Sequence, residues 1–100
     1  GLSQLIHTIN LVQERLNPHL QIEGVVFTMY DVRTNLSNQV VENVKENLDA
    51  KIYETMIPRN IRLAEAPSYG LPINMYDSKS AGAESYRKLA KEIINRKDLD

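Results

Sequence analysis

Two stretches of this 100-residue sequence decide its fold: Gly24-Val-Val-Phe-Thr-Met-Tyr-Asp-Val-Arg-Thr-Asn-Leu-Ser37 and Ile57-Pro-Arg-Asn-Ile-Arg-Leu-Ala-Glu-Ala-Pro-Ser-Tyr-Gly70. Each stretch couples an apolar run to a loop that contains arginine and asparagine. In a parallel sheet, both loops would open at the same edge, which is where such folds place their ligands. The sequence therefore predicts a binding site at that edge.

The first thirty residues predict a helix followed by a strand. Apolar residues recur on one helical stripe from Leu2 to Leu16, and Asn17-Pro18 is a common helix stop. From Ile22 to Tyr30 the apolar residues become contiguous, in a run too short for a helix. This second pattern is typical of a strand buried on both faces.

The middle of the chain predicts a second helix and a second strand. A helix from Asn35 to Leu48 has Thr34, Asn35 or Ser37 available as its N-cap. A strand from Lys51 to Ile57 should end at Pro58, because proline lacks the N–H group that a ladder needs. Strand, helix and strand form a right-handed unit with a parallel pair, which brings Asp31–Arg33 beside Pro58–Asn60.

The last forty residues predict a long loop and a final helix. Residues 60–78 hold two of the four prolines and are predicted to form a long loop with one helical turn at Ile61–Ala66. Tyr69 and Tyr76 should pack this loop onto the domain. Ser80 should cap the helix that follows. The expected fold class is α/β, in a single domain over residues 1–100 with the order helix, strand, helix, strand, long loop, helix.

Composition excludes several classes of function. The absence of cysteine removes disulfide scaffolds, cysteine zinc sites and thiol nucleophiles. A net charge of −1 supports no global argument for nucleic-acid or membrane binding, so any basic surface must come from particular loops. His7 and His19 have no metal-ligand spacing. Without a membrane span or a signal-peptide pattern at the start, a cytoplasmic location is expected.

The two quoted stretches resemble the C-terminal part of the ParA/Soj chromosome- and plasmid-partitioning ATPases, of the deviant Walker-A (MinD/ParA) class. The similarity continues through Pro72-Ile73, Tyr76-Asp77 and Gly82-Ala-Glu84 to Lys91-Glu92, and so covers essentially the whole chain. Two long motifs in the right order make the match specific. The resemblance implies a portion of a P-loop NTPase-type parallel sheet.

The resemblance also implies ATP and Mg²⁺ as the cofactors of the intact protein, held by an N-terminal Lys-Gly-Gly-x-Gly-Lys-Thr loop. The glycines here are Gly1, Gly24, Gly70 and Gly82, and none lies in such a motif. We therefore expect this chain to be a fragment without the P-loop half. Alone it should bind no cofactor and be inactive, because phosphoryl transfer depends on groups that position the phosphates and the metal.

Site residues follow from the resemblance, one position at a time. The strand ends flank the adenine in this family, which implies base contacts from Thr28, Met29, Pro58, Arg59 and Asn60. Without the resemblance, Met29 is equally well explained as core and Pro58 as a strand terminator. Arg33 and Arg62 align with arginines that bind DNA without sequence preference. Their alternative roles are ion pairs with Asp31 and Glu65, and Lys79, Arg87 and Lys88 are candidates to extend the basic surface.

Three classes of function remain open from the sequence. The first is a partitioning ATPase at the nucleoid, with nonspecific DNA, a ParB-type centromere-binding protein and a homodimer in the ATP state as its partners. The second is a MinD-type membrane-cycling ATPase, which the final segment, Lys88 to Asp100, supports poorly because it lacks Trp and Phe. The third is an interaction domain without a nucleotide role.

Overall fold

The computed structural model describes residues 2–49 and 51–99. Two long non-helical segments, 17–34 and 51–60, run largely extended between its helices. The order along the chain is α1 (Leu2–Arg15), α2 (Asn35–Asn47), α3 (Ile61–Glu65), the 3₁₀ helix η1 (Ala66–Tyr69), α4 (Ile73–Tyr76) and α5 (Ala81–Leu99).

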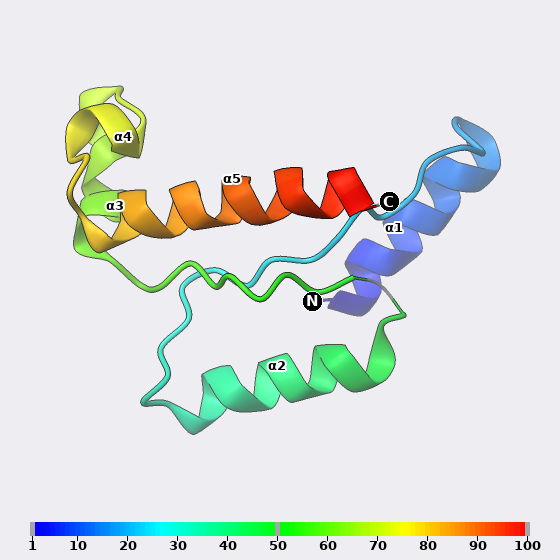
Figure 1. The fold of residues 1–100 in the computed structure, drawn as a ribbon. Helices are drawn as coiled ribbons and strands as arrows, with labels where there is room; N and C mark the ends of the chain where they lie inside the picture. The colour runs from blue at the N-terminus through cyan, green and yellow to red at the C-terminus, as the bar shows by residue number, and fades with distance from the viewer. Residues whose placement is uncertain (1, 50, 100) are drawn as a thin grey trace.

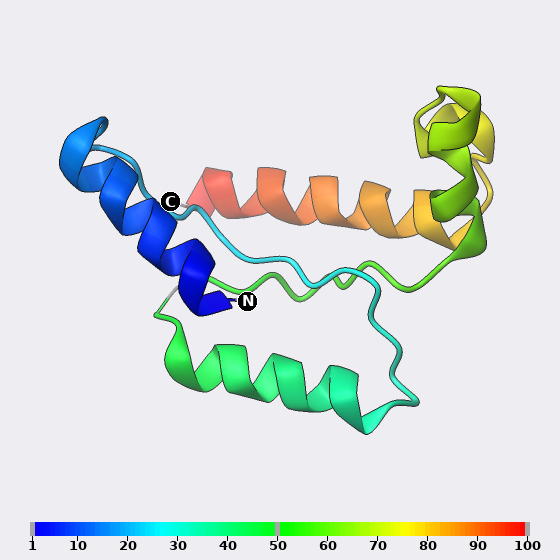
Figure 2. The same ribbon diagram turned by 180° about the vertical axis from the view of Figure 1, so that it is seen from behind.

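The two extended segments run side by side through the middle of the molecule (Figure 1). α5 lies along one side of this pair and α2 along the other, as the reverse view in Figure 2 also shows. The short helices α3, η1 and α4 cluster at the end of the molecule where α5 begins. A layer of extended backbone between helices is the arrangement expected of an α/β protein.

The predicted strands at 22–30 and 51–57 do not form as continuous strands within the described residues. The segments instead meet at two isolated parallel bridges, Val25 with Ile52 and Tyr30 with Pro58. The offset between paired residues changes from 27 to 28 between the bridges (52 − 25 and 58 − 30). One extra residue in the second segment therefore interrupts the ladder, as a bulge does. The parallel direction agrees with the prediction, whereas the sheet order stays a prediction.

The expectation that Pro58 ends the pairing is wrong. The Tyr30 N–H group donates to the Ile57 carbonyl at 3.1 Å, and the Arg59 N–H group donates to the Tyr30 carbonyl at 3.2 Å. Both bonds use the neighbours of Pro58, so the bridge at this position needs no N–H group from the proline itself. A proline whose missing donor would face away from the pair is tolerated at the edge of a sheet.

Two side chains of α5 bind the outer side of the second segment. The Glu92 carboxylate accepts from the N–H groups of Glu54 at 2.7 Å and Thr55 at 2.9 Å. The Arg96 guanidinium donates to the Ile52 carbonyl at 3.2 Å, pairs with Glu92 at 3.1 Å and lies 5.0 Å from the centre of the Tyr53 ring. These contacts fix α5 on the extended pair and satisfy backbone groups that another strand would otherwise use.

The helix caps follow the predictions. Thr34 caps α2, because its hydroxyl accepts from the Ser37 N–H group at 3.2 Å. The Ser80 hydroxyl accepts from the Ala83 N–H group at 3.1 Å at the start of α5. Each cap satisfies one of the N–H groups that the first turn of a helix leaves without a partner.

The segment predicted as a loop at 60–78 is mostly helical, so that prediction is wrong beyond its first turn. α3 continues directly into η1, with Pro67 in the first turn of η1, and Pro72 is the N-cap of α4. Proline suits the first turn of a helix because its N–H group would have no partner there. Tyr69 and Tyr76 stack with their ring centres 5.0 Å apart, which joins η1 to α4.

The core is small and lies between the extended pair and its flanking helices. Ile57, on the second segment, is only 2% exposed. The other buried apolar residues are Val41, Val44, Tyr53, Ala66 and Ala83. Through Ile57 the core reaches the bridge between Tyr30 and Pro58, and Ala66 on η1 and Ala83 on α5 extend it beyond the extended pair.

Candidate functional site

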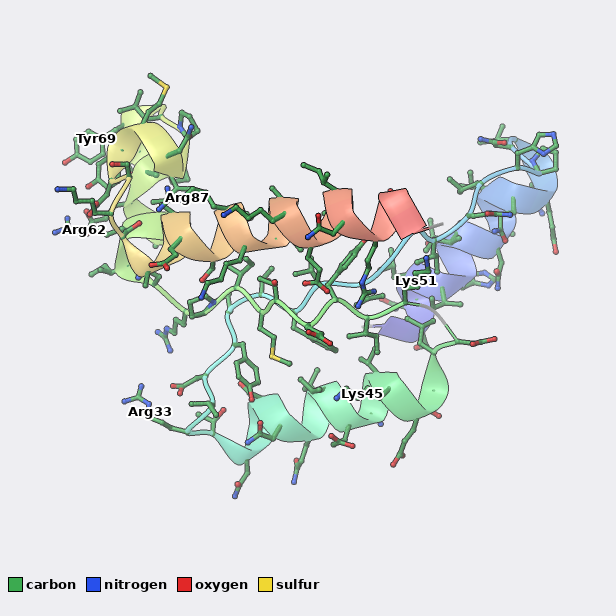
Figure 3. All side chains as sticks on the ribbon, viewed as in Figure 1. Arg33, Lys45, Lys51, Arg62, Tyr69 and Arg87 are labelled. Atoms are coloured by element: carbon green, nitrogen blue, oxygen red, sulfur yellow. The ribbon has the colours of Figure 1, made fainter. Side chains whose placement is uncertain are left out.

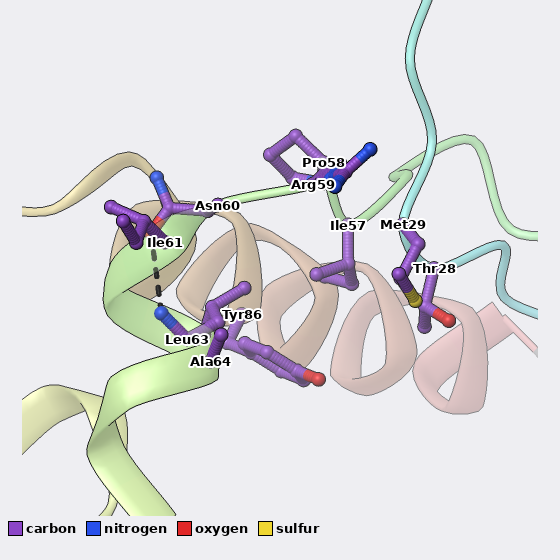
Figure 4. A pocket seen from close by; sticks show the side chains of 10 residues that line it. All are labelled: Thr28, Met29, Ile57, Pro58, Arg59, Asn60, Ile61, Leu63, Ala64 and Tyr86. Carbon is purple, nitrogen blue, oxygen red and sulfur yellow. Dashed lines mark hydrogen bonds between the residues drawn. The ribbon is translucent and has the colours of Figure 1, made fainter.

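A cavity of about 590 Å³ opens where the two extended segments end (Figure 4). All five residues predicted to contact the base line this cavity: Thr28, Met29, Pro58, Arg59 and Asn60. Ile57, three residues of α3 and Tyr86 of α5 complete the wall, the α3 residues being Ile61, Leu63 and Ala64. The structure thus brings together residues that lie about thirty positions apart in the sequence.

The backbone at Met29 shapes one wall of the cavity. Met29 has a φ of +54°, the one positive φ at a non-glycine residue in the described part of the chain. Such a conformation is uncommon outside glycine and is concentrated at functional sites. The residue is 71% exposed, so the interpretation of Met29 as a simple core residue does not hold. The left-handed turn lies between the two bridges, where the pairing shifts by one residue.

Asn60 connects the cavity to α3. Its side-chain oxygen accepts hydrogen bonds from the N–H groups of Arg62 at 3.1 Å and Leu63 at 3.4 Å, and it thereby caps the helix. Figure 4 draws the bond to Leu63 as a dashed line. The cap fixes the orientation of the amide, because only its oxygen accepts hydrogen bonds from N–H groups.

Tyr86 is one of the cavity residues that the sequence missed. Its place in the apolar stripe of α5 predicts core packing, yet the residue is 43% exposed and lines the cavity. It is the single aromatic side chain in the cavity wall. An exposed ring within a mostly apolar wall suits a flat heterocycle.

Arg33 is held by the carboxylate of Asp31 in the loop before α2. Its Nε atom lies 3.0 Å from Oδ1, and its Nη2 atom lies 3.0 Å from Oδ2. The pair is two-pronged but open to solvent, because 86% of the Arg33 side chain is exposed. Hydrogen bonds from Arg33 hold the pKa of Asp31 below its usual value. The ion pair that the sequence offered as an alternative role for Arg33 is therefore present.

Arg62 is also paired, with two carboxylates. Its Nη1 atom lies 3.2 Å from Glu65 Oε2 on α3, and its Nε atom lies 3.4 Å from Asp77 Oδ2 after α4. The Tyr76 hydroxyl bonds to the same Glu65 oxygen. This hydroxyl and Arg62 hold the pKa of the Glu65 carboxyl below its usual value. The guanidinium therefore joins α3 to the end of α4, with about half of its side chain exposed.

Two further arginines, Arg59 and Arg87, differ in their surroundings. Arg33 and Arg59 line one surface depression of about 370 Å³, beside the bridge between Tyr30 and Pro58. Arg59 therefore borders both the base cavity and the loop of Arg33. The Arg87 guanidinium donates to the Ser78 carbonyl at 2.8 Å and so serves the turn before α5. Figure 3 shows Arg33 and Arg62 near the same end of the molecule, on different elements.

Residues 2–49 and 51–99 contain neither a metal-binding cluster nor a helix that could span a membrane. No group of three or more His, Cys, Asp or Glu side chains is placed there to hold a metal ion. No helix there is long and apolar enough to cross a membrane.

The chain is similar to known nucleotide-binding proteins. Residues 1–73 match the CobQ/CobB/MinD/ParA nucleotide binding domain. The chain is 59% identical over 93 residues to the sporulation initiation inhibitor protein Soj of Bacillus subtilis, a match that covers 93% of this chain and 37% of that protein. It is 52% identical over 96 residues to the chromosome partitioning protein ParA of Caulobacter vibrioides, covering 96% of this chain and 36% of the relative.

A third relative is the chromosome-partitioning ATPase Soj of Thermus thermophilus, 44% identical over 96% of this chain and 39% of the relative. The chain spans little more than a third of the length of these proteins. The match over residues 1–73 shows that the chain belongs to the CobQ/CobB/MinD/ParA nucleotide-binding family, in which its sequence is similar to the Soj and ParA proteins.

Proposed function

We propose that this chain supplies the base-binding wall and the DNA-contacting arginines of a chromosome-partitioning ATPase. The observation that carries the proposal is the cavity at the segment ends, where Thr28–Met29 and Pro58–Asn60 line one space with mostly apolar walls. Concave, largely apolar sites with a few polar groups are typical of nucleotide-base binding. The names of the relatives support the partitioning role.

In this proposal each wall of the cavity has a different task. Met29 and Pro58 offer apolar surface to the faces of the adenine ring, and Asn60 and the Thr28 hydroxyl offer polar atoms to its edge. Arg59, at the border of the cavity, is placed for the negatively charged part of the ligand. The chain has no Gly-Lys-Ser/Thr motif. The phosphates and Mg²⁺ are therefore assigned to a P-loop outside these residues, where bound ATP supplies the phosphoryl group for hydrolysis.

The DNA-binding part of the proposal rests on Arg33 and Arg62. A guanidinium forms two parallel hydrogen bonds with a phosphate as it does with a carboxylate, so DNA phosphates can replace Asp31 or Glu65 as partners. Two contacts per monomer predict a slope of log K against log salt of about −2, and an ATP-dependent dimer would double it to about −4. Dimerisation would then control retention on DNA.

The other expected partners complete the proposed role. A ParB-type centromere-binding protein would act on the ATP-bound homodimer, in the cytoplasm at the nucleoid. The MinD-type alternative differs in one measurable property, which is binding to vesicles of anionic lipid. Such binding by the full-length protein would favour the alternative.

Charge reversal at Arg33 tests the DNA contact. In the full-length protein, Arg33→Glu and Arg62→Glu should each abolish retention on nonspecific DNA while nucleotide affinity stays unchanged, because both arginines lie outside the base cavity. Filter binding or fluorescence anisotropy with nonspecific DNA at low salt measures the loss. Arg15→Glu at the end of α1 makes the same charge change away from both loops and serves as the control. Unchanged DNA affinity in both loop variants would contradict the proposal.

A further inference from the structure

We infer that Asn60 reads the bound base only as a hydrogen-bond donor, through its amide NH₂ group, and so selects a ring nitrogen that carries a lone pair. The inference rests on the proposed function and specifies the chemistry of the same cavity. Two facts in the structure carry it: Asn60 lines the cavity, and its side-chain oxygen already caps α3.

The cap decides which end of the amide is left for a ligand. Asn60 Oδ1 accepts from two N–H groups, those of Arg62 and Leu63. Turning the amide over would place an NH₂ group against two N–H donors and would leave both N–H groups without this acceptor, which is unfavourable. In the described residues, the Nδ2 atom has no hydrogen-bond partner in the protein. The NH₂ group is therefore the available end.

A donor at this position restricts the edge of the base that it can read. Adenine offers the lone pairs of N1, N3 and N7 as acceptors, whereas its exocyclic N6 amino group is a donor. Asn60 therefore binds a ring nitrogen and leaves the N6 amino group to another acceptor. The carbonyl groups of Thr28 and Pro58 have no hydrogen-bond partner in the described part of the chain and come from residues that line the cavity.

The same residue also links the base to the proposed DNA contact. Asn60 caps the helix whose second residue is Arg62. A substitution that removes both the cap and the NH₂ group would disturb α3 and the base together. A test of base reading must therefore keep the cap and change only the donor.

The substitution Asn60→Ser keeps the helix cap and removes the NH₂ donor. The serine hydroxyl caps a helix about as well as asparagine does, but the shorter side chain does not replace the amide that reaches the base. The full-length proteins with Asn60 and with Asn60→Ser are titrated by calorimetry with adenosine and with its 1-deaza, 3-deaza and 7-deaza analogues. The protein with Asn60 should bind at least one deaza analogue roughly three- to tenfold more weakly than adenosine, the worth of one neutral hydrogen bond. Asn60→Ser should bind adenosine and that analogue equally.

Protection of the Arg62 and Leu63 amides from hydrogen exchange confirms that the serine variant keeps the cap, and Asn60→Ala should lose this protection. Equal binding of all four ligands by the protein with Asn60, or the same discrimination in Asn60→Ser, would overturn the inference while the base cavity stands. Failure of the protein with Asn60 to bind adenosine at all would overturn the proposed function and the inference with it.

Discussion

At the scale of single residues, the two arginines proposed to bind DNA are already engaged with carboxylates. Arg33 makes two 3.0 Å bonds to Asp31, and Arg62 lies within 3.4 Å of both Glu65 and Asp77. A DNA phosphate must therefore displace a partner within the protein. Exposed ion pairs contribute only about 0–1 kcal/mol, so the competition lowers affinity without preventing binding.

Removing the competing carboxylate should strengthen DNA binding. Asp31→Asn releases Arg33 and removes a negative charge from the loop, so the affinity of the full-length protein for nonspecific DNA should rise by up to about fivefold. Anisotropy titrations at two salt concentrations measure the change. Glu42→Gln, on the exposed side of α2, removes the same charge elsewhere and should have a smaller effect. A weaker complex with Asp31→Asn would mean that Asp31 positions Arg33 for DNA instead of competing for it.

The sequence could predict which residues meet at the site but not how their polar atoms are shared. The resemblance to the ParA/Soj family implied that Thr28, Met29, Pro58 and Asn60 surround the base, and the structure brings them around one cavity. Tyr86 was not predicted as a site residue, because an apolar helical stripe looks the same whether its aromatic ring is buried or lies at the rim of a cavity. The positive φ of Met29 was not predicted either, because it lies where the pairing between two distant segments shifts by one residue, and no local sequence pattern records that shift.

At the scale of elements, Glu92 makes the main polar attachment between α5 and the extended pair. Its side chain is only 16% exposed. Burial raises the pKa of its carboxyl, but the N–H groups of Thr55 and Glu54 and the charge of Arg96 outweigh burial and hold the pKa below the ordinary 4.5. Because the unfolded chain then binds the proton more readily, this contribution to stability is complete above that value and is lost as the pH falls through the folded-state pKa.

Neutralising Glu92 should therefore destabilise the protein in a pH-dependent way. Glu92→Gln keeps one acceptor and loses the charge, so we expect a loss of about 1–2 kcal/mol in the free energy of unfolding at about pH 7. The difference should shrink as the pH is lowered from about 7 to about 3, because the carboxyl of the parent protein gains its proton as the pH falls through the folded-state pKa, which lies below the ordinary 4.5. Urea unfolding at both pH values measures it, with Glu46→Gln on the exposed side of α2 as the control. A pH-independent difference would assign the effect to packing.

The elements themselves show where sequence patterns succeed and where they fail. Helices α1, α2 and α5 follow from their apolar stripes and capping residues, and the parallel direction follows from the crossover. The prediction of two continuous strands was wrong, because a hydrogen-bonded ladder requires matched register along its whole length. The loop at 60–78 was misread because its prolines occupy helix starts, where the residue does not break a helix.

At the scale of the whole molecule, the structure exposes more surface than its mass requires. Its accessible surface is 7807 Å², whereas a compact monomer of 11.4 kDa should expose about 5,800 Å². Its radius of gyration is 15.7 Å, against about 13 Å for a compact domain of this length. Part of the excess is apolar: Leu36 is 71% exposed and borders a groove with Phe27 and Val40.

This surface predicts self-association of the 100-residue chain on its own. In the described residues, the N–H and C=O groups of Val26 and Thr28 have no backbone partner, and the apolar groove lies beside them. Exposed backbone edges next to apolar surface promote pairing between chains. Light scattering should show a mass that rises with concentration, and Leu36→Asp should reduce the rise. A single monomer mass at high concentration would contradict the prediction.

The way α5 closes the second segment limits how far such pairing can extend. Arg96 binds the carbonyl of Ile52, Glu92 binds the amides of Glu54 and Thr55, and Pro58 has no amide proton to offer. Each molecule therefore has one open edge, along the first extended segment, and one edge that α5 covers, along the second. When two molecules pair through their open edges, neither has an open edge left for a third molecule. The association should therefore stop at a symmetric dimer instead of growing into a fibre.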